Sequence, residues 1–174
     1  MKTDKNLFSV GIVGCGLIGH KRAKALGSGG VLVACADRDF SKAEGLAATY
    51  GAVAYGNWMD LLKIAHLDIV VVSTLHDSLA EITEAFVLAG KNVLVEKPAS
   101  RSMDELGNMM ERIKNYDAKV RVGFNHRYHR ALLKAKAIID SGDLGELMFI
   151  RARYGHGGRK GYDREWRADP KISG

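Results

Sequence analysis

The fold of this chain is decided by Phe8-Ser9-Val10-Gly11-Ile12-Val13-Gly14-Cys15-Gly16-Leu17-Ile18-Gly19, an apolar run that passes into three spaced glycines and then into helical sequence. Gly14 permits a tight turn, Gly16 lets a ligand approach the backbone, and Gly19 lets the helix pack against the strand. The amide groups at the start of that helix then face an anion. The pattern predicts a strand, turn and helix that hold the pyrophosphate of a dinucleotide.

A second apolar run covers residues 31–36 and ends at Asp37. A carboxylate at this point can accept hydrogen bonds from the two hydroxyls of an adenosine ribose. The same carboxylate repels a 2'-phosphate and therefore favours NAD. Arg38 can stack on adenine and offset that repulsion, which leaves NADP open.

Composition places the chain among ordinary soluble globular proteins. It has 174 residues, of which 47% are hydrophobic and 26% charged, and its length suits about one domain. No apolar run approaches the roughly 18 residues that span a bilayer, and the charged residues 1–6 carry no apolar signal segment. We therefore expect a cytoplasmic protein without membrane association, with Cys15 and Cys35 as reduced thiols and without a metal site.

The net charge of +6 is concentrated towards the end of the sequence. Residues 151–174 carry seven Lys and Arg against three acidic residues. Basic patches can bind nucleic acid, but no recognition-helix motif or aromatic platform accompanies this charge. It favours an anionic small substrate or a cofactor phosphate over nucleic acid.

Apolar runs alternate with amphipathic stretches along the chain. The runs predict strands at residues 8–13, 31–36, a short one near 52–54, 68–73, 91–95 and 119–124. Several are apolar on both faces, as in parallel strands covered by helices on each side. The order predicts an α/β fold, a doubly wound parallel sheet of Rossmann type with ligands at the carboxyl ends of the strands.

Helices are predicted by apolar stripes at helical spacing. Asp77 or Ser78 is a candidate first cap, Gly90 a candidate end, and Ser102 with Glu105 a candidate capping box. The three stripes expected to be buried consist of Leu79, Ile82, Phe86 and Ala89; of Met103, Leu106, Met110 and Ile113; and of Tyr128, Leu132, Ala135 and Ile139.

The pattern changes after about residue 124. One helix, an extended run over residues 147–154 and a polar arm follow, which is too little to close a core. We therefore expect a dinucleotide-binding domain at residues 1–124, and at 125–174 the beginning of an incomplete α+β domain for substrate binding and oligomerisation.

Five segments spread over the whole chain resemble the Gfo/Idh/MocA oxidoreductases, named for glucose-fructose oxidoreductase and inositol dehydrogenase. Glu96-Lys97-Pro98, on the strand after a Gly-Lys turn, is the most distinctive of them. The segments are residues 14–19, 36–38, 89–98, 122–128, and 166–170 ahead of Ser173-Gly174.

The resemblance implies binding of NAD or NADP on the first domain and oxidation or reduction of a carbon in a small sugar, nucleotide sugar or polyol. Lys97 would be the catalytic lysine, also contacting substrate, with Asn125 and Arg127 as further substrate contacts; intact members imply a homo-oligomer. The cofactor-binding residues it implies are Gly14, Cys15, Gly16, Leu17, Ile18, Gly19, Asp37, Arg38, Ser73, Thr74, Leu75, His76, Glu96, Trp166 and Arg167.

The chain departs from the family pattern at two places. Thr74-Leu75-His76 replaces the usual Thr-Pro-Asn, and Leu79 stands where the family has a His. The family also continues after Ser173-Gly174 with a carboxylate and a catalytic His. His76 is either a loop-surface residue or a substrate contact, and Arg127 either a substrate contact or part of an ion pair.

Two other functions fit parts of the pattern. A non-catalytic dinucleotide-binding module would need only the glycine turn and Asp37. A methyltransferase also places a glycine loop after its first strand and an acid after its second, but Glu96-Lys97-Pro98 has no role there.

Overall fold

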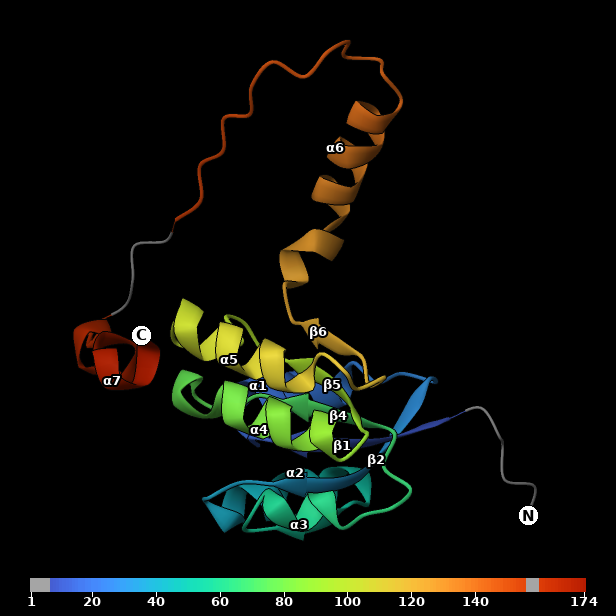
Figure 1. Ribbon diagram of the computed structural model, residues 1–174, viewed down its shortest axis with the longest axis vertical. Helices are drawn as coiled ribbons and strands as arrows, with labels where there is room; N and C mark the ends of the chain where they lie inside the picture. The colour runs from blue at the N-terminus through green and yellow to red at the C-terminus, as the bar shows by residue number, and fades with distance from the viewer. Residues whose placement is uncertain (1–6, 156–159) are drawn as a thin grey trace. The chain divides into compact units, whose positions relative to one another are not determined.

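The computed structural model describes residues 7–155 and 160–174 (Figure 1). The chain divides into two compact units. The first unit comprises Met1–Gly123 with Asp169–Gly174, and the second unit comprises Phe124–Ala168. No helix in the described part is long and apolar enough to cross a membrane.

A six-stranded parallel sheet forms the centre of the first unit. Its order is β3-β2-β1-β4-β5-β6, so the direction in which strands are added reverses between β1 and β4. This is the order of a doubly wound dinucleotide-binding sheet, and ligands bind where the direction reverses. The strands are β1 (Phe8–Val13), β2 (Gly30–Ala36), β3 (Val53–Tyr55), β4 (Ile69–Val72), β5 (Asn92–Val95) and β6 (Val120–Val122).

Helices cover both faces of this sheet, which confirms the predicted α/β fold. Successive side chains of a strand point to opposite faces, so Val70 and Val72 join one buried cluster and Val71 the other. The first cluster includes Leu61 and Phe86, from α3 and α4, and the second includes residues of α1 and α2. The helices are α1 (Leu17–Lys24), α2 (Phe40–Tyr50), α3 (Met59–Leu62), α4 (His76–Leu88), α5 (Met103–Ile113) and α7 (Pro170–Ser173).

The start of α4 differs from the prediction. Leu75 is the N-cap residue, and no side chain caps the helix. Ser78 Oγ instead donates to the carbonyl oxygen of Leu75 at 3.2 Å, so the expected cap at Asp77 or Ser78 is wrong. Gly90 ends the helix with φ of +75° as predicted, whereas Ala89 is exposed rather than part of the buried stripe.

The buried stripe of α5 is shifted from the predicted one. Met109 is buried, whereas Met103 and Met110 are 80% and 58% exposed. Ser102 caps the helix, since its Oγ accepts from Glu105 N at 3.2 Å. The second half of the expected capping box is absent, because the Glu105 carboxylate accepts from Arg101 N instead.

The second unit has few buried side chains. The predicted stripe of Tyr128, Leu132, Ala135 and Ile139 is exposed, because the described residues supply no apolar surface to cover it. Residues 147–154 form no strand, contrary to the extended run expected there. The elements are η1 (Asn125–Tyr128), α6 (Arg130–Asp140), η2 (Tyr162–Arg164) and η3 (Trp166–Ala168).

Candidate cofactor-binding site

The turn after β1 requires glycine at two positions. Gly14 has φ of +92°, and a Cβ there would lie 2.6 Å from the carbonyl carbon of Ser73. A Cβ on Gly19 would lie 2.1 Å from the carbonyl oxygen of Gly14. Ser73 Oγ donates to that oxygen at 2.7 Å. The turn is therefore fixed against both α1 and the end of β4.

Gly16 has a different environment. Its backbone is extended, with φ of −76° and ψ of −165°, which any residue adopts. A Cβ built on Gly16 meets no protein atom within 4 Å. The first amides of α1 have no acceptor within their own helix, and its first turn carries no acidic side chain. This arrangement suits an anion held close to the backbone.

The carboxylate of Asp37 is oriented by two backbone amides. Cys15 N donates to Oδ2 at 2.7 Å and Asp39 N donates to Oδ1 at 2.9 Å. These bonds hold the half-buried side chain at the end of β2, beside the glycine turn. Each carboxylate oxygen can accept further hydrogen bonds, so Asp37 can receive a pair of hydroxyl groups.

A cleft of about 670 Å³ opens along this edge of the sheet, within the usual range for small-molecule sites. The predicted cofactor residues that line it are Gly14, Gly16, Asp37, Arg38, Ser73, Thr74 and Leu75.

Other lining residues were missed by the sequence analysis. Gly56, Asn57 and Trp58 follow β3 directly, so the rule that ligands meet the carboxyl ends of parallel strands could have found them. The cleft-lining side chains of α2 and α4 belong to no sequence motif that would identify them as ligand-binding. The missed residues are Val13, Ala36, Lys42, Gly56, Asn57, Trp58, Asp77, Ser78, Glu81 and Ile82.

Glu96 lies at the end of β5 but does not line the cleft. Its carboxylate is buried in an ion pair with Arg22 of α1, whose Nε donates to Oε1 at 2.7 Å and whose Nη2 contacts the same oxygen. A Cβ on Gly123 would lie 2.5 Å from Arg22 Nη2. The pair therefore joins α1 to β5 beneath the chain that follows β6.

Five more of the predicted cofactor residues of the first unit lie outside the cleft lining: Cys15, Leu17, Ile18, Gly19 and His76. Gly19 is buried against the glycine turn. Cys15 is buried, Leu17 is 72% exposed and Ile18 lies beside it in the first turn of α1. His76 Nδ1 lies 3.2 Å from the carbonyl oxygen of Ser173. This contact explains its half-buried position.

Lys97 is exposed and is the second residue after β5, at the carboxyl edge of the sheet where the cleft also opens. No hydrogen bond or ion pair of its ammonium group is formed within the described residues. The group can therefore donate to a ligand without first breaking a protein contact.

The remaining candidates lie in the second unit. Asn125 and Arg127 are exposed in η1. Arg167 Cζ lies 4.4 Å from the centre of the Trp166 ring, and its Nη1 donates to Glu165 Oε2 at 3.0 Å. The cleft described above is formed by residues of the first unit.

Both cysteines are buried and free. Cys15 Sγ donates to the carbonyl oxygen of Ala36 at 3.4 Å, and Cys35 Sγ to that of Ala43 at 3.3 Å. The hydrogen bond with Cys35 and burial raise the pKa of the Cys15 thiol far above its usual range. Cys15 is therefore a neutral packing residue under the glycine turn.

This fold and cleft define a dinucleotide-binding domain of the Rossmann type, and comparison with known proteins agrees. Residues 8–124 match the model of the oxidoreductase family with an NAD-binding Rossmann fold (Gfo/Idh/MocA). The chain belongs to this family.

Its relatives include polyol and sugar dehydrogenases. Inositol 2-dehydrogenase 2 of Saccharopolyspora erythraea is 31% identical over 156 residues, 87% of this chain and 46% of the relative. A putative myo-inositol dehydrogenase from Sinorhizobium meliloti superposes with a TM-score of 0.75 at 31% identity, over 80% of this chain and 43% of that one. A levoglucosan dehydrogenase in complex with NADH and levoglucosan superposes with a TM-score of 0.73 at 27% identity, over 79% of this chain and 40% of that one. The chain thus spans less than half the length of these relatives.

Proposed function

We propose that the cleft binds a nicotinamide dinucleotide and that the chain forms the cofactor-binding part of an oxidoreductase acting on a sugar or polyol. The observation that carries the proposal is Gly16. Its position is open to the cleft, its backbone does not need glycine, and a side chain there would occupy the space in front of the α1 amides. A ligand that approaches the backbone accounts for its glycine.

The strand order supports one orientation of the ligand. The pyrophosphate lies over the glycine turn, at the point where strand addition reverses. Asp37, at the end of β2, receives the adenosine ribose. The nicotinamide half then extends past Thr74 and Leu75, which follow β4, towards Lys97, the second residue after β5.

When bound, the dinucleotide supplies the acceptor or donor of a hydride. Lys97 donates a hydrogen bond to the hydroxyl or developing alkoxide of the substrate, which polarises the reacting carbon. A sugar or polyol is proposed because the relatives named above act on inositol and levoglucosan. Asn125 and Arg127 remain candidates for substrate binding, and Trp166 and Arg167 for cofactor binding.

Titration with NADH, followed by its fluorescence, tests the proposal. Gly16→Val is expected to lower NADH affinity at least tenfold while the unfolding transition stays unchanged, because its backbone tolerates a side chain and only the ligand is displaced. Gly45→Ala in α2 is the matched control, since a Cβ there also meets nothing. No fluorescence change with NADH or NADPH would reject the proposal, as would equal affinity of the wild type and Gly16→Val.

We further propose that NAD is preferred over NADP. Lys42 Nζ lies 3.0 Å from Asp39 Oδ2, so part of its charge is neutralised, whereas Asp37 faces the position of a 2'-phosphate. Arg38 moderates this preference. Asp37→Ser should reduce the ratio of NADH to NADPH affinity at least tenfold; an unchanged ratio would remove Asp37 as its cause.

Turnover separates the enzyme from a binding module. Reduction of NAD with myo-inositol and related polyols, lost in Lys97→Met while NADH still binds, supports catalysis by this chain. Binding without turnover across such a panel supports the non-catalytic module; the chain spans less than half the length of its relatives. A cytoplasmic location and a homo-oligomer stay predictions from the sequence.

A further inference from the structure

The segment of residues 169–174 packs on α4 within the first unit. It contains α7, which has four residues. Asp169 Oδ1 accepts from Lys171 N at 2.9 Å and caps this helix. A helix of this length is not stable in isolation, so contacts with the rest of the first unit must hold it.

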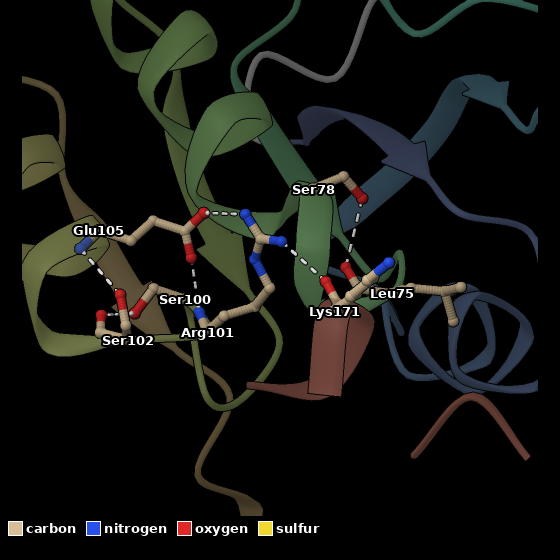
Figure 2. Close-up of polar contacts among 7 residues, drawn as sticks. All are labelled: Leu75, Ser78, Ser100, Arg101, Ser102, Glu105 and Lys171. Carbon is tan, nitrogen blue, oxygen red and sulfur yellow. Dashed lines mark hydrogen bonds and ion pairs between the residues drawn. The ribbon is translucent and has the colours of Figure 1, made fainter. Parts of the chain in front are cut away.

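Arg101 makes the central contact (Figure 2). Its Nη1 donates to the carbonyl oxygen of Lys171 at 2.8 Å. That carbonyl belongs to the single turn of α7, and carbonyls at the end of a helix lack partners within the helix. A guanidinium is suited to this acceptor because its charge strengthens the hydrogen bond.

Glu105 orients the guanidinium for this contact. Its Oε2 accepts from Arg101 N at 2.6 Å and its Oε1 from Arg101 Nη2 at 3.1 Å. Burial works against the charged carboxylate, but these hydrogen bonds hold the pKa of Glu105 below its usual value. Ser102 Oγ in turn accepts from Glu105 N, so the first turn of α5 presents the pair as one unit.

A second contact lies on α4. His76 Nδ1 is 3.2 Å from the carbonyl oxygen of Ser173, and His76 directly follows Leu75, which lines the cleft. Gly174 packs against Arg101, since a Cβ at Gly174 would lie 2.2 Å from the Arg101 carbonyl oxygen. The segment is therefore held from both α4 and the loop before α5.

We propose that Arg101, Glu105 and His76 form a docking surface for residues 169–174 of the same chain, in which Arg101 is a positioning residue that binds the carbonyl end of α7. This goes beyond dinucleotide binding, since Arg101 and Glu105 do not line the cleft. The docking surface thereby fixes where residues 169–174 lie within the first unit.

Hydrogen exchange of the intact chain, measured by mass spectrometry without nucleotide, tests this proposal. The amides of Ile172 and Ser173 donate to the carbonyl oxygen of Asp169, and that of Gly174 to Pro170. They should exchange slowly in the wild type and about tenfold faster in Arg101→Met, the effect of losing one hydrogen bond to a charged group. Amides of β1 and β4 should be unchanged, whereas a general structural role would accelerate them too.

Arg112→Met is the matched control. Arg112 lies on α5, near its end, and its ion pair is with Glu84 of α4 at 2.7 Å rather than with residues 169–174. Equal acceleration in this variant would overturn the proposal, as would unprotected amides in the wild type or unchanged ones in Arg101→Met. If Arg101→Met unfolds the sheet, Glu105→Gln decides: a severalfold faster exchange of residues 172–174 alone supports the docking surface, and no change rejects it.

Because nucleotide is absent from the measurement, failure of NADH to bind would leave this result unaffected. The two proposals can therefore fail separately.

Discussion

The two units of the molecule carry similar apolar stripes but bury them very differently. In the first unit Phe86 of α4 is fully buried against the sheet. In the second unit Leu132 of α6 is 51% exposed and Phe149 is 80% exposed. An amphipathic stripe thus predicts which face of a helix is apolar. Whether that face is buried also depends on an apolar surface that packs against it, and the described part of the second unit has none for α6.

Truncating one side chain from each stripe should give the largest difference between the units. Phe86→Ala is expected to lower the free energy of unfolding by about 3–5 kcal/mol, because a large side chain is removed from a closed core. Leu132→Ala should change it by less than about 0.5 kcal/mol. Urea unfolding followed by circular dichroism measures both.

Tryptophan fluorescence can assign each transition to its unit. The chain has two tryptophans, Trp58 in the first unit and Trp166 in the second. A Trp166→Phe background makes the signal report on the first unit alone. If Leu132→Ala lowered the free energy of unfolding as much as Phe86→Ala does, the apolar stripe of α6 would be buried in solution, and the difference in burial between the two units would not hold.

Ion pairs extend the comparison to charged side chains. Arg22→Met is expected to lower the free energy of unfolding by about 2 kcal/mol, because it leaves the Glu96 carboxylate without this ion pair. The site is largely buried, since the side chains of Arg22 and Glu96 are only 18% and 11% exposed. Lys136→Met in α6 should lower the free energy of unfolding by less than about 0.5 kcal/mol, since the side chains of Lys136 and Asp140 in this ion pair are 72% and 56% exposed.

The same variant tests the role of Glu96. If Glu96 acts through Arg22, Arg22→Met should lower stability while NADH affinity, measured well below the unfolding transition, stays within about twofold. A tenfold loss of affinity in the folded variant would instead favour the role in cofactor binding that the family resemblance implies.

What could be predicted from sequence was local. The strand at residues 8–13 and the turn at Gly14 depend on contiguous residues, and β1 has the predicted bounds. Trp58 could have been found from its place after β3, whereas Lys42 of α2 reaches the cleft only through the folding of the sheet, and no residue spacing in the sequence predicts it. The predicted burial of Met103 in place of Met109 failed because both satisfy a helical period, and only the position of α4 and the sheet decides between them.

The smallest expected effect comes from helix caps. Ser102 Oγ caps α5 and His129 Nδ1 caps α6, accepting from Ala131 N at 3.3 Å. Ser102→Ala should lower the free energy of unfolding of the first unit by about 1 kcal/mol, because loss of a cap in a packed helix is felt by the whole core. His129→Ala should reduce helical circular dichroism slightly without moving the Trp58 transition, because α6 is not part of that core. A shift of this transition by His129→Ala would mean that the two units unfold together.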